Sequence, residues 1–199
     1  MVRNYLRYDA VLPLATSNAI LWQGSPEYYR LIRQDGYTYL QVWNEVIYGP
    51  GNEGHDPGTI EGERYWNRRA LQSIRAEPHI YALFFAEKLG TYWIGDPNAD
   101  WGDTFVFNFR ALRMWGFSRA ETAQMMAIRA VPIVGLVAIV VLRRRWRELL
   151  PVLAVLAYCT LLHAATHAEA RLSDPLQPLL LVLIAGAGAV VTSRLRADS

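Results

Sequence analysis

The clearest pattern in this sequence is a set of three long apolar runs after Ser118. The first run follows the letters SRAE over 118–121, an S-x-x-E capping box that predicts the start of a helix. A helix over 118–142 would be about 37 Å long, enough to cross a hydrocarbon core of about 30 Å. The other two runs predict spans over 148–166 and 176–192, both near the lower length limit. Short apolar runs also form buried helices in soluble bundles, but three of them with basic flanks favour an integral membrane protein.

The arginines in the short connections predict how these spans are oriented. The turn between the first two spans reads RRRWR over 143–147, and the C-terminal tail carries Arg194 and Arg196. The connection between the second and third spans carries only Arg171. The positive-inside rule therefore places 143–147 and the C-terminus in the cytoplasm, and it places residues 1–117 and the loop around Arg171 outside.

The first 117 residues predict a small mixed, mostly helical region. Ser25 followed by Pro26 is typical of a helix start, and the glycines and prolines that follow separate short elements. The pattern predicts helices over 26–34, 59–76 and 78–93, partial strand character over 37–47, and a glycine-rich loop over 49–58. The predicted fold class is mainly α, with an extracytoplasmic region over 1–117 and a transmembrane region over 118–199.

Composition excludes some functions and raises one question about the N-terminus. The formal net charge of +2 is small and the basic residues are spread along the chain, so no nucleic-acid partner is expected. Cys159 is the single cysteine and cannot form an internal disulfide. The residues after Met1 lack the uninterrupted apolar core of a signal peptide. We therefore expect an upstream span, on the same chain or another, to export the region over 1–117.

Three blocks of the sequence resemble a known enzyme family. They read ATSNAILWQGSPEYY over 15–29, GERYWNRRALQSIRAEPHIYALFFAEKLGTYW over 62–93 and EARLSDPLQPLL over 169–180. Together with the order of the spans, they resemble the C-terminal half of glycosyltransferase family 39, which is related to the dolichyl-phosphate-mannose protein mannosyltransferases. Leu172 stands where tyrosine is commoner in that family. The resemblance implies a GT-C-type membrane enzyme in the bacterial inner (plasma) membrane.

The resemblance also implies a reaction. Members of the family transfer a sugar from a polyprenyl phosphate to an acceptor on the outer face, with an acidic residue in their first external loop as general base. That loop has no counterpart in this sequence, so we expect a C-terminal part that is inactive alone. Its expected partners are the polyprenyl-phosphate sugar, membrane lipid, and the N-terminal half of the enzyme or another membrane subunit. No cofactor is expected. The alternative is a non-catalytic membrane protein that binds a lipid-linked sugar or a partner enzyme.

Two arginines are candidates for holding the donor phosphate. Arg171 lies in the external loop beside Glu169 and Asp174, and its planar guanidinium can bind a phosphate through two contacts. The alternative is a salt bridge within the loop. Arg129 is ionisable and lies inside a predicted span, where such residues often serve function, although it can also extend its side chain toward the membrane surface.

Other candidates lie near a possible cleft or acceptor site. His163 and His167 stand four apart in the predicted second span with Glu169 close after, but Ala164 replaces the glutamate of a metalloprotease motif, so hydrogen bonding is preferred to a metal site. The DPNAD segment over 96–100 resembles the start of a calcium loop without its glycine and glutamate in place. Contacts with an acceptor sugar are assigned to aromatic and loop residues, namely Trp22, Trp43, Glu53, His55 and Asp56. The other reading for tryptophans is an interfacial belt, which suits Trp93, Trp101 and Trp115.

Overall fold

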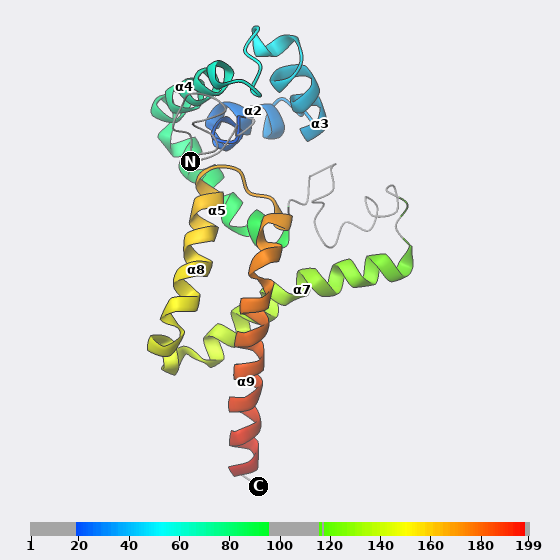
Figure 1. Cartoon of the computed structure of the whole chain (residues 1–199), viewed down its shortest axis with the longest axis vertical. Coiled ribbons are helices and arrows are strands. Elements are labelled where there is room, and N and C mark those ends of the chain that lie inside the picture. Colours follow the sequence, from blue (N-terminus) through cyan, green and yellow to red (C-terminus); the bar gives the residue numbers. More distant parts are fainter. Residues whose placement is uncertain (1–18, 96–115, 117, 198–199) are drawn as a thin grey trace, which may run out of the picture. The chain divides into compact units, whose positions relative to one another are not determined.

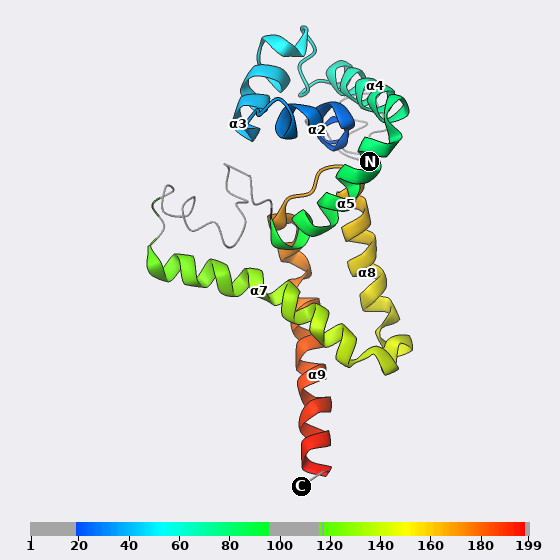
Figure 2. The ribbon, with the colours of Figure 1, turned by 180° about the vertical axis from the view of Figure 1, so that it is seen from behind.

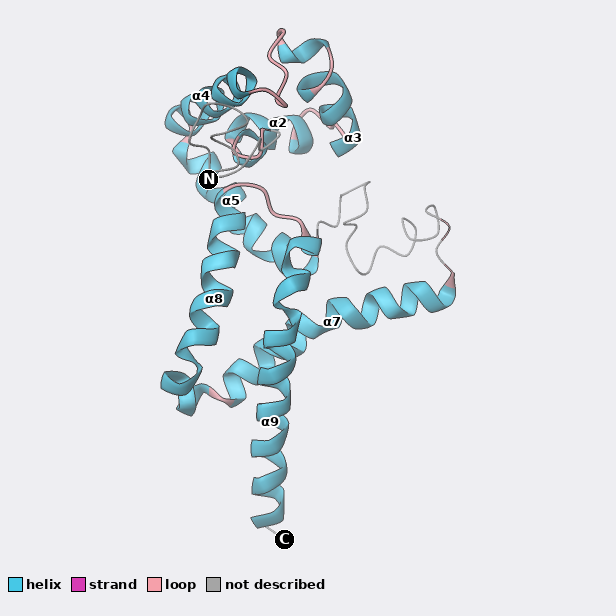
Figure 3. Cartoon of the chain, viewed as in Figure 1, coloured by secondary structure: helices cyan, strands magenta, loops and turns pink. Residues whose placement is uncertain are grey.

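The computed structural model describes residues 19–95, 116 and 118–197, and these residues form two compact units. Unit 1 contains the described residues up to Lys88 together with Ala164–His167. Unit 2 contains the described residues from Leu89 to His163 and from Ala168 onward. Within the described ranges the secondary structure is entirely helical, joined by loops (Figure 3). The two units are described separately below.

Unit 1 consists of helices whose starts are fixed by local capping. Ser25 caps its helix by accepting a hydrogen bond from the backbone N–H of Tyr28 (3.4 Å), and Pro26 occupies the first helical position. Thr59 caps the longest helix by accepting from the N–H of Gly62 (3.0 Å). In chain order the elements are η1 (Trp22–Gly24), α2 (Pro26–Arg33), α3 (Tyr39–Gln41), η2 (Val42–Ile47), η3 (Pro50–Asn52), α4 (Ile60–Ala76) and α5 (Pro78–Ile94), which continues into unit 2 (Figure 1).

The partial strand expected over 37–47 is wrong, because this segment is helical. Thr38 and Gln41 form a reciprocal capping box, with Gln41 N–H donating to Thr38 Oγ1 (3.1 Å) and Thr38 N–H donating to Gln41 Oε1 (2.9 Å). The following turn is π-helical, and this wider turn brings Val42 and Ile47, five residues apart, into the same core. A local cap therefore overrides the weak alternation of the sequence.

The core of unit 1 is built mainly from aromatic rings. Trp22 and Trp66 are fully buried and meet edge-on with ring centroids 4.8 Å apart. Tyr28 packs against Trp22 (5.5 Å) and stacks on Phe84 of α5 (6.3 Å). These large rings bury much apolar surface in a small unit, which is why α2, α4 and α5 pack around the η1 segment.

Unit 2 contains three long helices in its C-terminal part. They are α7 (Arg119–Val141), α8 (Trp146–Ala165, whose last residues belong to unit 1) and α9 (Gln177–Ala197), connected by η4 (Arg143–Arg145) and η5 (Ala170–Leu176). The capping box predicted at the start of α7 is confirmed, since Ser118 N–H donates to Glu121 Oε2 (2.8 Å) and Glu121 N–H donates to Ser118 Oγ (3.2 Å). Helix α7 crosses α9 in both views (Figures 1 and 2). Gly135 permits this crossing, because a Cβ there would stand 2.9 Å from Leu180 Cδ2.

The three helices are long and apolar enough to cross a membrane, so the chain has the features of a multi-pass membrane protein. The segments that meet these criteria of length and composition are Arg119–Val141, Arg143–Ala165 and Leu172–Arg196. Helix α9 continues beyond the predicted end at 192 and reaches Ala197, with the hydroxyls of Thr192 and Ser193 donating to carbonyls of the same helix. At most 24% of each apolar window is buried within the chain. Such exposed apolar surface requires lipid or other membrane helices around it.

Candidate functional site

The predicted phosphate ligand Arg129 lies in an ion pair within unit 2. Its Nη1 donates to Asp174 Oδ1 at 2.8 Å, so α7 is joined to the η5 connection. The Arg129 side chain is 7% exposed, whereas that of Asp174 is 45% exposed. Gln177 Nε2 also donates to Asp174 Oδ1 (3.0 Å). The side chain of Arg129 is thus paired with a carboxylate at the end of the span, which differs from the alternative of extending toward the membrane surface.

The η5 connection is held by backbone contacts close to Arg171. The hydroxyl of Tyr92 donates to the carbonyl of Leu172 at 3.2 Å, and Leu172 N–H donates to the carbonyl of Glu169 at 3.0 Å. Asp174, one of the two partners considered for Arg171, accepts from Arg129. The side chain of Arg171 itself lies outside the described part of the structure.

The histidine pair does not form as expected on one helix face. Helix α8 ends at Ala165, so His163 is in its last turn and His167 follows in the loop. The hydroxyl of Tyr81 donates to the carbonyl of Ala165 (2.9 Å). This bond satisfies a carbonyl at the helix end, which has no partner within the helix, and so favours ending the helix there. His163 stacks on Tyr92 with centroids 5.1 Å apart. Burial raises the pKa of Tyr92 to about 12. Glu169, half-buried, immediately precedes η5. Within the described ranges no group of three metal-ligating side chains forms.

Unit 1 contains a buried amine that the sequence did not assign. Lys88, the only lysine of the chain, is 3% exposed. Its Nζ donates to the carbonyls of Thr166 (2.8 Å) and Gly24 (3.3 Å) and lies 4.5 Å from the centroid of the Phe84 ring. Burial lowers the pKa of Lys88 to about 7, while the carbonyl acceptors oppose that shift by favouring the charged form. The sequence feature that could have indicated this buried amine is a single lysine within an apolar predicted helix.

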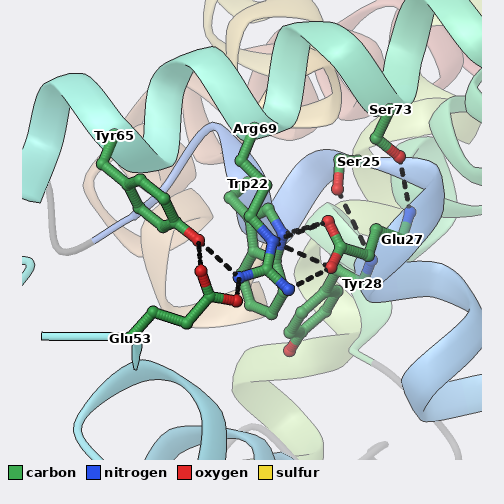
Figure 4. Close-up of polar contacts among 8 residues, drawn as sticks. All are labelled: Trp22, Ser25, Glu27, Tyr28, Glu53, Tyr65, Arg69 and Ser73. Atoms are coloured by element: carbon green, nitrogen blue, oxygen red, sulfur yellow. Dashed lines mark hydrogen bonds and ion pairs between the residues drawn. The ribbon is translucent and has the colours of Figure 1, made fainter. Parts of the chain in front are cut away.

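A polar cluster around Arg69 lies beside the aromatic core of unit 1 (Figure 4). Arg69 binds Glu27 through two nitrogens, with Nε–Oε1 at 2.9 Å and Nη2–Oε1 at 2.5 Å. Its Nη1 donates to the hydroxyl of Tyr65 (3.1 Å), and that hydroxyl donates to Glu53 Oε2 (2.9 Å). The guanidinium also lies 5.2 Å from the centroid of the Trp66 ring. The charges are mutually satisfied, which is typical of a structural network.

The structure brings some of the predicted acceptor residues together in this region. Trp22 is fully buried and donates from Nε1 to Glu27 Oε2 (2.9 Å), so its ring faces the core. His55 stacks on Tyr65 with centroids 4.0 Å apart. Asp56 stabilises the loop before α4 by accepting from the N–H of Gly58 (2.7 Å).

The remaining aromatic candidates lie elsewhere. Trp43 is 39% exposed and contacts Tyr48, with centroids 4.9 Å apart. Trp93 packs on Tyr92 in unit 2 (5.1 Å). The segment 96–100, Trp101 and Trp115 lie outside the described residues.

Unit 2 contains an apolar hollow of about 540 Å³. It is bounded by α7, α8, the end of α5 and the first turn of α9, including Trp93, Ile133, Leu136, Thr160 and Leu180. Its lining is apolar except for the Trp93 indole N–H and Thr160, whose hydroxyl donates to the carbonyl of Leu156 (2.6 Å). The hollow therefore suits a hydrocarbon ligand rather than a sugar.

The chain matches no protein-family model, no curated protein and no solved structure.

The Arg69 cluster yields a first prediction about stability. Glu27→Ala should lower the free energy of unfolding of unit 1 by about 2 kcal/mol, because it removes the acceptor of the Trp22 N–H and the carboxylate that Arg69 binds through two nitrogens. Glu27→Gln keeps an oxygen for Trp22 and should cost about half as much. Hydrogen exchange of peptides from α4, followed in detergent micelles, measures the effect. The exposed acid Glu61 is the control, and an equal loss for Glu61→Ala would contradict the assignment.

Proposed function

We propose that this chain forms the donor-binding part of a membrane glycosyltransferase that uses a polyprenyl-phosphate sugar. The apolar hollow of unit 2 carries the proposal, because it is of the size and polarity that an isoprenoid chain requires. It opens among helices that are long and apolar enough to lie in a bilayer. A lipid-linked donor could then remain in the membrane while its head group reaches the surface.

The position of the basic residues supports the same proposal. Ile133 lines the hollow four residues after Arg129, which is about 6 Å along the helix axis. Arg129 is joined to Asp174 of η5, and Arg171 belongs to the same short element. A phosphate attached to an isoprenoid in the hollow would thus meet the η5 connection. Because Arg129 is already bound to a carboxylate, we assign the phosphate to Arg171.

In the proposed reaction the acceptor hydroxyl attacks the anomeric carbon of the sugar. The bond from this carbon to the phosphate oxygen breaks, and polyprenyl phosphate leaves with an additional negative charge. Arg171 would stabilise that charge through two N–H···O contacts. The proton of the hydroxyl passes to a carboxylate, which the family resemblance places in the first external loop of such enzymes.

Filling the hollow tests this proposal. Leu136→Trp should weaken binding of a photoreactive polyprenyl phosphate by about tenfold. The indole would occupy space that the isoprenoid needs, and the lost apolar contact would cost about 1.4 kcal/mol of binding free energy. The chain is reconstituted in nanodiscs, and crosslinked peptides are quantified against unlabelled polyprenyl phosphate as competitor. Val182→Trp is the matched control, since Val182 is 66% exposed, Leu136 is 64% exposed, and Val182 does not line the hollow.

Three outcomes would contradict the proposal. Crosslinking that diacyl phosphate displaces as well as polyprenyl phosphate would indicate an ordinary lipid groove. Equal crosslinking of Leu136→Trp and wild type would place the donor elsewhere. Binding without sugar transfer, even when the acidic loop is supplied, would favour a non-catalytic protein that holds lipid-linked sugars.

A further inference from the structure

The outward face of α4 carries three arginines in a row. Arg64, Arg68 and Arg75 are exposed, and at 100° per residue they fall within a sector of about 40°. The sector lies opposite the face formed by the buried Trp66 and Ala70. Along the helix axis the three arginines span about 16 Å. They therefore form one basic stripe, which is the side of α4 that the unit does not use for packing.

The charges of this stripe are not neutralised within the described part of the chain. Other arginines of unit 1 have acidic partners: Arg30 binds Glu77, and Arg69 binds Glu27. Within the described residues no ion pair joins Arg64, Arg68 or Arg75 to a carboxylate. Exposed guanidinium groups with free donors are well suited to phosphate oxygens, which they can bind through two contacts.

The same face also has an apolar component. Leu71 lies between Arg68 and Arg75 and is 43% exposed. A shallow surface hollow of about 730 Å³ runs along the stripe, lined by Ile60, Glu61, Arg64, Asn67, Arg68 and Leu71. Basic residues that flank an exposed leucine are typical of helices that lie at a membrane surface. An acidic protein partner would explain the charge but would not require the leucine.

We propose that the Arg64–Arg68–Arg75 face of α4 docks on the head groups of anionic phospholipids. The positive charge of the stripe complements the phosphates of the bilayer surface, and Leu71 can insert at the head-group boundary. The chain also contains three helices long and apolar enough to cross a membrane, so it is expected to be associated with a bilayer. The proposal depends on this membrane association and is independent of any sugar transfer.

Fluorescence quenching in nanodiscs tests the docking. The reporter is a fluorophore on Gln72→Cys, an exposed position of α4 beside the stripe, in a full-length chain with Cys159→Ala. The quencher is a spin label on lipid head groups, in discs of phosphatidylcholine alone or with phosphatidylglycerol. Quenching should be stronger in the anionic discs and should fall in high salt. A second reporter at Leu40→Cys, exposed on α3, should not depend on the arginines of α4.

Neutral variants give the expected size of the effect. Each Arg→Gln change should lower the docking constant about fivefold, the factor corresponding to about 1 kcal/mol for a basic residue near an anionic surface, and the triple variant roughly a hundredfold. The triple Arg→Lys variant should retain most of the docking. Unchanged hydrogen exchange in α4 would show that the variants are folded.

Several results would overturn the inference. Equal quenching in neutral and anionic discs would show that docking does not depend on electrostatic attraction. Full quenching of the folded triple Gln variant would show that the three arginines are not needed for docking. Binding of the stripe to polyglutamate but not to anionic discs would identify an acidic protein as its partner instead.

Discussion

Raising the pH from 7 to 9 should stabilise unit 1 by about 2 kcal/mol through Lys88 alone. The pKa of this buried amine is about 7, compared with 10.5 for an exposed lysine, so between these values the unfolded chain binds a proton that the folded chain lacks. Stability rises with pH wherever the unfolded state binds more protons. Below pH 7 the folded chain carries the full cost of a buried charge, at most on the order of 5 kcal/mol, and above 10.5 the cost disappears.

The neutral amine can keep both hydrogen bonds of the charged form. It still has two N–H donors, matching the carbonyls of Thr166 and Gly24. Hydrogen exchange of a peptide covering 19–29, compared at each pH with Lys88→Met, isolates the effect because intrinsic exchange rates cancel. The methionine variant should lack the pH slope even though it leaves two carbonyls unpaired. A parallel slope in both proteins would show that Lys88 does not titrate in this range.

Replacing Arg171 by lysine should reduce sugar transfer by a hundredfold or more. Lysine keeps the positive charge but loses the planar two-contact geometry of the guanidinium. Loss of one positioned contact to a developing negative charge typically costs about 2.7 to 4 kcal/mol in the transition state. The measurement is transfer from a polyprenyl-phosphate sugar by the chain combined with the acidic loop that the resemblance assigns to the general base, at equal membrane levels of each variant.

Arg129 is the matched control for this experiment. Its Nη1 donates to Asp174, and lysine keeps a positive donor for this carboxylate, so Arg129→Lys should keep transfer close to that of the wild type. Arg171→Ala should be at least as damaging as Arg171→Lys. Near-normal transfer by both Arg171 variants would mean that Arg171 serves only the loop, where an exposed ion pair is worth about 0 to 1 kcal/mol.

Local sequence determined the helices and where they begin. The capping residues Ser25, Thr59 and Ser118 each satisfy backbone N–H groups a few residues away, so the information that starts α2, α4 and α7 is contained in single turns. The three apolar runs are long enough to form spans without reference to the rest of the chain. Thr38 and Gln41 form a capping box that is also local in sequence, and it outweighs the apparent strand pattern.

Tertiary structure decided which side chains meet. Arg129 and Asp174 are 45 residues apart, and only the crossing of α7 and α9 brings η5 to the arginine. His163 and His167 have helical spacing in the sequence. The hydroxyl of Tyr81, on α5, donates to the carbonyl of Ala165, and helix α8 ends there, between the two histidines. The sequence allows Trp22 to be a ring that binds sugars, but in the folded chain Trp66 and Tyr28 pack against it.

The same distinction explains why Lys88 and the stripe on α4 were not assigned from sequence. The pKa of Lys88 depends on the packing of residues 24, 84 and 166, which no periodicity relates to residue 88. The arginines of α4 are visible in the sequence, but which of them are neutralised depends on acids brought from other elements, such as Glu27 beside Arg69. Helix formation is governed by contacts over a few residues, whereas burial and charge pairing depend on distances that only the folded chain sets.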